Sequence, residues 1–227
     1  MVLNKTNQSK IKLTIEIVIC YLLMLIMVLL FNKLSNLLHT DSLWMGVLTY
    51  AFVAIPILIY VSQVEKKPMS SIGLYRITVK EVLIGVIIGA VMFLAQQIPF
   101  LIMGTDYGMF ASSPDWQFIL VRSIFCIVCV GFTEEIVLRG FILHKSMLLF
   151  NNRVLAVILN CIVFYMIHWP PVRFVFGEFF NITLNTLILC GYFFISRKKS
   201  IVPLIVAHGV YDIMAIYLLP AAAYYFF

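Results

Sequence analysis

The chain has 227 residues, of which 63% are hydrophobic and only 11% are charged, and its mean hydropathy is +1.05. A soluble domain usually carries about 25% charged residues, so no water-soluble core could hide this much apolar surface. The composition therefore excludes an ordinary soluble protein and predicts a chain that folds in a lipid bilayer.

Apolar stretches of the roughly 20 residues that cross a bilayer as a helix recur along the whole chain. The first follows Lys5, Lys10 and Lys12 and is too long for the core of a cleavable signal peptide. The sequence thus predicts an all-α, polytopic transmembrane bundle of about seven helices. We place these helices near residues 13–31, 44–63, 82–103, 117–138, 154–169, 174–195 and 201–219.

Four local features qualify this scheme. The stretch 139–153 is expected either to extend a helix beyond the bilayer or to lie in the interface. Asn151-Asn152 predicts a turn between two antiparallel helices, and Trp169-Pro170-Pro171 predicts a kink. Glu16 lies near the cytoplasmic end of the first helix and is expected to reach water.

The positive charges are distributed unevenly between the two sides of the predicted bundle. Thirteen of the sixteen Lys and Arg residues fall in the amino-terminal segment and in alternate loops, two fall in the other loops, and Arg122 lies within a span. The positive-inside rule then places the amino terminus in the cytoplasm of a multi-pass protein of the cell membrane. The formal net charge of +6 follows from this topology, so it does not indicate nucleic-acid binding.

Ionisable residues within membrane spans are costly unless they pair or line a wet cavity, so they indicate function. Glu134 and Glu135 are neighbours on one predicted helix and diverge by roughly 100°. One of them should face a central cavity, while the other can turn toward Arg139, which lies one turn beyond Glu135. His208 and Asp212 are four residues apart and share one helical face.

These residues, together with His168, form a set suited to hydrolysis. A carboxylate can deprotonate water, and neutral imidazoles can hold a metal ion or donate hydrogen bonds to an oxyanion. Two histidines, one carboxylate and a water would suit zinc. Buried charges also occur in ion-coupled transporters, but the paired broken helices in two related halves that typify such transporters are not found in the sequence.

The residues fall into three ordered motifs on separate helices: E-E-x-x-x-R, F-x-x-x-H and H-x-x-x-D. The corresponding residues are Glu134, Glu135 and Arg139, then Phe164 and His168, then His208 and Asp212. This combination resembles the CPBP intramembrane proteases, a family of CAAX prenyl proteases and bacteriocin-processing enzymes also called Abi. The resemblance covers about residues 116–217, which suggests a catalytic helical core at 116–227 and amino-terminal helices and loops at 1–115.

The resemblance also implies roles for individual residues. Glu134 corresponds to the catalytic carboxylate that activates water. His168 and His208 correspond to histidines that bind either a metal or the water and oxyanion, and Asp212 completes the site. Glu135, Arg139 and Phe164 correspond to supporting residues. Two mechanisms are compatible with these roles: hydrolysis assisted by a divalent metal, zinc, held by Glu134, His168 and His208, and metal-free hydrolysis by glutamate.

The leading hypothesis is therefore a bacterial intramembrane endopeptidase that acts on a membrane-associated peptide or protein. A prenylated CAAX protein, a signalling-peptide precursor and a bacteriocin leader are all possible substrates. The alternatives are a non-proteolytic bacteriocin-immunity or interaction protein on the same scaffold and an ion-coupled transporter.

Overall fold

The computed structural model describes residues 5–38, 43–104, 106–168 and 176–226, and every regular element within these ranges is helical. The predicted all-α class is thus confirmed. In chain order the elements are α1 (Lys5–Leu38), α2 (Leu43–Ile59), η1 (Tyr60–Val64), η2 (Met69–Ile72), α3 (Val79–Ile102), η3 (Tyr107–Phe110), α4 (Trp116–Phe125), η4 (Cys126–Gly131), α5 (Phe132–Glu135), η5 (Ile136–Leu143), α6 (His144–Phe150), α7 (Arg153–His168), α8 (Phe176–Ile195), α9 (Val202–Asp212), η6 (Ile213–Leu218) and α10 (Leu219–Phe226). Of these, η1, η4, η5 and η6 are π-helical, whereas η2 and η3 are 3₁₀-helical.

Five helical stretches in the described part of the chain are long and apolar enough to cross a membrane, and two shorter apolar helices accompany them. The long stretches are Ser9–Phe31, Leu43–Val64, Val79–Phe100, Trp116–Phe150 and Val202–Phe226, and the shorter ones are Arg153–His168 and Phe179–Ile195. Together they match the seven predicted helices, so the chain is a multi-pass membrane protein. The predicted helix ends at 169 and 174 and the predicted kink at Trp169-Pro170-Pro171 lie outside the described residues.

One unusually long helix runs from Trp116 to Phe150, through α4, η4, α5, η5 and α6. Its 35 residues span about 50 Å at 1.5 Å per residue, which exceeds a hydrocarbon core of about 30 Å. The stretch after Arg139 therefore extends a helix, the first of the two expectations for this region. The helix ends at Asn151, whose φ of 50° is left-handed, and the Asn152 side chain accepts a 2.8 Å hydrogen bond from Val154 N at the start of α7. The predicted turn is confirmed.

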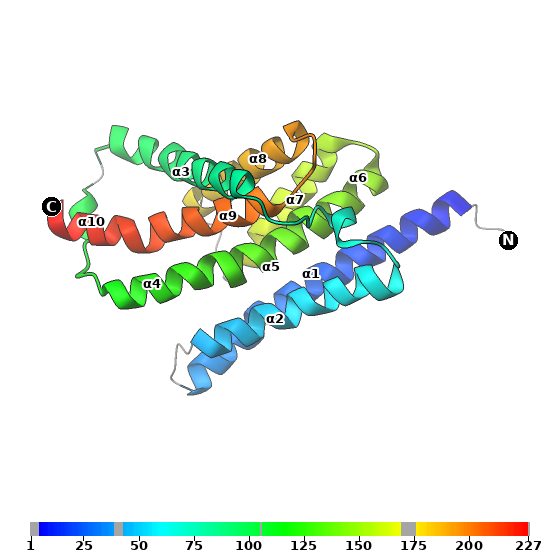
Figure 1. Ribbon diagram of the computed structural model, residues 1–227, viewed down its shortest axis with the longest axis horizontal. Helices are drawn as coiled ribbons and strands as arrows, with labels where there is room; N and C mark the ends of the chain where they lie inside the picture. The colour runs from blue at the N-terminus through cyan, green and yellow to red at the C-terminus, as the bar shows by residue number, and fades with distance from the viewer. Residues whose placement is uncertain (1–4, 39–42, 105, 169–175, 227) are drawn as a thin grey trace.

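Close helix packing places α9 between α3 and the long helix. Figure 1 shows α9 and α10 running between α3 on one side and α4 and α5 on the other. A Cβ added at Gly85 or Gly89 of α3 would lie 2.6 Å from Val206 Cβ or Ala207 O of α9. A Cβ added at Gly131, at the end of η4, would lie 2.6 Å from the carbonyl oxygen of Ile205. Small residues at both contacts let the backbones approach, which is how helices associate in a membrane.

Gly209 of α9 offers a test of this packing, because a Cβ there would lie 2.7 Å from Ile127 Cα and 2.9 Å from Ile127 N. These are backbone atoms, so the two helices would have to separate. We expect Gly209→Ala to destabilise the protein by about 1–3 kcal/mol, the usual cost of overpacking. Gly191→Ala on α8 is the matched control, since a Cβ there meets nothing within 4 Å. Thermal unfolding in detergent measures both, and equal melting temperatures would contradict the packing.

Ion pairs and backbone contacts gather several polar connections at one end of the bundle. Lys145 of α6 lies 2.8 Å from Glu16 of α1 and also pairs with Glu65, which follows η1. Glu16 is 8% exposed, so the expectation that it reaches water is wrong: the lysine from a distant helix neutralises its charge instead. Gly73 O accepts a 2.8 Å hydrogen bond from Ile201 N, which ties the connection before α3 to the start of α9. In Figure 1, α1 begins and α10 ends at opposite ends of the bundle.

Candidate active site

The two adjacent glutamates occupy the last positions of α5, a single α-helical turn between the π-helical segments η4 and η5. Side chains bind two carbonyl groups of η5: Asn160 Nδ2 donates to Leu138 O at 2.8 Å, and His144 Nδ1 lies 3.0 Å from Arg139 O. π-Helical turns inside longer helices occur frequently at functional sites. Here they set the directions in which Glu134 and Glu135 leave the helix.

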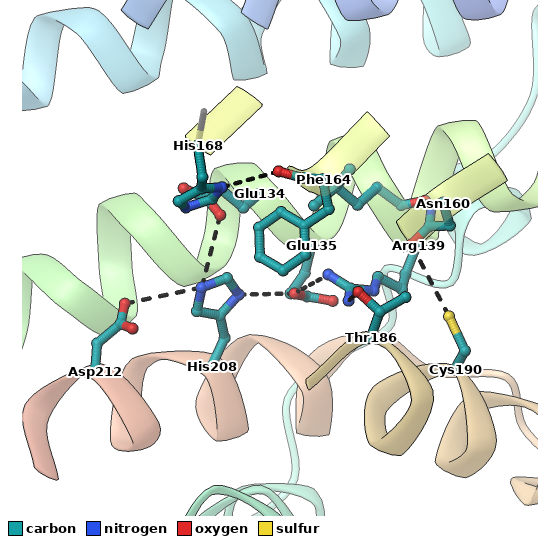
Figure 2. Close-up of polar contacts among 11 residues, drawn as sticks. Glu134, Glu135, Arg139, Asn160, Phe164, His168, Thr186, Cys190, His208 and Asp212 are labelled. Carbon is teal, nitrogen blue, oxygen red and sulfur yellow. Dashed lines mark hydrogen bonds and ion pairs between the residues drawn. The ribbon is translucent and has the colours of Figure 1, made fainter. Parts of the chain in front are cut away.

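Glu135 links Arg139 to His208 (Figure 2). Its Oε1 accepts a 2.7 Å hydrogen bond from Arg139 Nη1 and lies 2.8 Å from His208 Nδ1. Glu135 and Arg139 are both fully buried, so their charges neutralise one another away from water. An ionised carboxylate only accepts hydrogen bonds, which means that His208 Nδ1 carries the proton. The sequence predicted the contact with Arg139 but not the one with His208.

The other nitrogen of His208 faces two carboxylates. Its Nε2 lies 3.6 Å from Glu134 Oε2 and 3.8 Å from Asp212 Oδ2 (Figure 2). Glu134 is 4% exposed, and its Oε2 is buried with no hydrogen-bond partner among the described residues. A buried carboxylate oxygen without a partner is costly for stability, so such an atom is a candidate for binding a reacting group.

Phe164 connects the remaining motif residues by ring contacts. Its ring lies edge-on to those of His168 and His208, with centroids 4.7 Å and 5.9 Å away. The Arg139 guanidinium lies 5.1 Å from the centroid of the same ring, which is cation–π range. The ring of Phe164, expected to be a supporting residue, therefore contacts three other motif residues: His168, His208 and Arg139.

His168 occupies the last position of α7 and is solvent-exposed in the described chain. Its Nδ1 lies 3.0 Å from Phe164 O, and because a carbonyl only accepts, Nδ1 is the donor. In the view of Figure 2, the side chains of His168 and Glu134 overlap above His208. The structure thus brings together Glu134, Glu135, His208 and Asp212, while His168 reaches this group through Phe164 at the rim.

Two uncharged residues that the sequence reasoning missed also support the site. Thr186 Oγ1 of α8 accepts a 3.4 Å hydrogen bond from Arg139 Nη2, and Asn160 of α7 holds the Leu138 carbonyl. Both residues are fully buried. The sequence does hold a sign of their importance: each is a polar side chain within an apolar helix, which is rarer and more costly in a membrane than in water.

A metal centre was one expectation for this site. Among the residues that the structure describes, no three His, Cys, Asp or Glu side chains form a group that could hold a metal ion. The donor atoms near His208 Nε2 are of the right chemical kind for zinc, but these contacts join only pairs of residues. Zinc ligation by Glu134, His168 and His208 therefore stays a prediction.

The fold and the site together define a multi-pass membrane protein with a buried constellation of carboxylates and histidines inside a helical bundle. Residues 115–214 match the family model described as Rce1-like, type II CAAX prenyl endopeptidase. This span contains all three motifs, so the resemblance that the motifs predicted is confirmed over residues 115–214. Over these residues the chain is similar to intramembrane endopeptidases of the CAAX prenyl type. No curated protein and no solved structure matches the chain.

Proposed function

We propose that the protein is an intramembrane endopeptidase in which Glu134 activates water to hydrolyse a peptide bond. The observation that carries this proposal is the unpartnered, buried Glu134 Oε2, which lies 3.6 Å from His208 Nε2. A water bound between these two atoms would give one hydrogen to each of them as a hydrogen-bond donor. Its lone pair would then point away from both groups and toward a substrate carbonyl.

In the proposed reaction, Glu134 removes a proton from the water while the water oxygen bonds to the carbonyl carbon. The carbonyl electrons move to the oxygen, which forms an oxyanion stabilised by hydrogen-bond donors. We assign this stabilisation to His168 at the exposed rim of the site, acting as an imidazolium: its Nδ1 already donates to Phe164 O, so a second proton on Nε2 is needed to donate to the oxyanion. Glu134 then passes its proton to the nitrogen as the C–N bond breaks, acting first as base and then as acid.

The supporting residues in this proposal orient the histidine. Glu135 accepts from His208 Nδ1, so it holds the tautomer whose Nε2 can accept a hydrogen bond from water. Arg139 holds Glu135 in place through the 2.7 Å contact. Glu135 contacts Nδ1 of His208, whereas Asp212 lies 3.8 Å from Nε2. Asp212 therefore completes the group around the reacting water.

The family description favours a prenylated CAAX protein as substrate, and unprenylated signalling-peptide precursors and bacteriocin leaders are the other candidates. The test is cleavage of a panel of prenylated and unprenylated peptides by the purified protein in detergent. We expect cleavage of at least one class. If a folded protein cleaves no class of peptide, the alternative function, a non-proteolytic bacteriocin-immunity or interaction protein, is favoured instead.

Metal dependence is tested on the same preparation. Incubation with a chelator followed by dialysis should leave cleavage unchanged if Glu134 acts with the chain's own residues alone. Loss of cleavage that zinc restores would establish the predicted metal site. Elemental analysis of the purified protein gives an independent readout, because a bound zinc would be counted whether or not the chosen peptide is cleaved.

We also propose that the protein lies in the cell membrane with its amino terminus in the cytoplasm. The charge distribution supports this orientation, and so do the contacts that gather Lys145, Glu65 and the start of α9 at one end of the bundle. Reporters fused to the two termini should give opposite signals, cytoplasmic at the amino end and external at the carboxyl end. Identical signals from both fusions would refute an odd number of spans.

A further inference from the structure

A second buried polar cluster lies beside the candidate active site, and the reaction described above does not use it. Tyr211, which precedes Asp212 on α9, donates its hydroxyl hydrogen to Gln96 Oε1 of α3. Gln96 Nε2 in turn donates to Asn185 Oδ1 of α8 at 2.6 Å and to Asn181 O at 3.3 Å. One side-chain amide therefore joins three helices.

The burial of this cluster makes its geometry specific. Gln96 is 1% exposed and Asn185 is 7% exposed, and Gln96 belongs to the membrane-spanning part of α3. Water is not available there to replace a lost partner, so a misaligned amide would leave polar atoms unsatisfied. The amide of Gln96 uses both its oxygen and its nitrogen, which ties Tyr211 to a defined position relative to α3 and α8.

The position of Tyr211 matters because α9 changes its geometry immediately after the site. Asp212 is the last α-helical residue, and the π-helical segment η6 begins at Ile213. None of the residues of η6 is fully buried, so the packing of its side chains does little to fix the rotation of the helix about its axis. Tyr211 and Asp212 diverge by roughly 100° around the helix axis. Fixing Tyr211 against α3 and α8 therefore fixes the direction of Asp212.

We propose that Tyr211, Gln96 and Asn185 form a positioning network that sets the rotation of α9 at Asp212, and with it the placement of Asp212 against His208 Nε2. Its catalytic consequence rests on the proposed endopeptidase function, whereas its effect on the surroundings of His208 does not. The network acts through Asp212, so its three residues are positioning residues that do not touch the reacting atoms.

The kinetic test uses Tyr211→Phe, which removes only one hydroxyl group, and Gln96→Leu, which removes the central amide. Misplacement of a group in an active site costs up to about 100-fold in rate. We expect both variants to lower kcat about 10- to 100-fold with little change in KM. Gln97→Leu is the matched control on the next residue of α3, because the Gln97 side chain accepts a 3.3 Å hydrogen bond from Tyr107 instead. It should retain the wild-type kcat.

A spectroscopic test does not depend on finding a substrate. The chain has four histidines, so 15N-labelled histidine gives few signals, and His208→Gln identifies the one from His208. We expect Tyr211→Phe and Gln96→Leu to shift the His208 signal and Gln97→Leu to leave it in place. An unchanged His208 signal in folded Tyr211→Phe overturns the network, even if Gln96→Leu fails to fold. A shifted signal in a protein that cleaves no peptide retains the network and counts against the proposed endopeptidase.

Discussion

Glu134→Gln should abolish peptide cleavage while the protein stays folded. The substitution keeps the shape of the side chain but removes the carboxylate that accepts the proton of water. General base catalysis contributes about 10²- to 10⁴-fold, so activity should fall by at least about 100-fold. Because Glu134 Oε2 is buried without a partner, the neutral amide should leave the melting temperature unchanged or higher. Peptide cleavage and thermal unfolding measure the two effects on one preparation.

The matched variant is Glu135→Gln at the adjacent position. It should lower stability as well as activity, because Glu135 bonds to both Arg139 and His208. The pair of variants thus separates a reacting carboxylate from a structural one. Activity retained by Glu134→Gln would refute its role as base. A stability loss as large at Glu134 as at Glu135 would show that the Glu134 carboxylate also has a structural partner.

Arg139→Met should destabilise the protein by about 3–5 kcal/mol, since it leaves the charge of Glu135 buried and uncompensated. The methionine retains most of the side-chain volume, so a cavity contributes little. Arg153→Met at the exposed start of α7 is the control and should change stability by less than about 1 kcal/mol. Unfolding in detergent with a chemical denaturant gives both values.

The double variant Arg139→Met with Glu135→Leu sharpens this prediction. Removing both charges removes the unpaired charge, and replacement of buried ion pairs by apolar residues is often neutral for stability. We therefore expect the double variant to recover most of the lost stability but not the activity, because His208 Nδ1 has lost its acceptor. Failure to recover stability would show that Glu135 and Arg139 have essential contacts beyond each other.

Several features of this protein are visible in the sequence because they depend on residues close together in the chain. The apolar stretches predicted the helices, and the four-residue spacing of Glu135 and Arg139 predicted their ion pair on one helical face. The Asn151-Asn152 pair likewise predicted the turn after α6. The three motifs predicted the resemblance to CAAX prenyl endopeptidases over residues 115–214, since their order and spacing are properties of the chain itself.

Only the tertiary structure decided how residues on different helices face one another. The bond of Glu135 to His208, the pairing of Glu16 with Lys145 and the link from Gln96 to Tyr211 all cross between helices. Such contacts depend on the rotation and depth of each helix, which close glycine packing and π-helical turns set in this bundle. Helical periodicity assigns a residue to a face, but it does not state which helix that face meets. The sequence therefore predicted that Glu135 pairs with Arg139 on its own helix, whereas the contacts of both glutamates with His208 depend on how the helices pack.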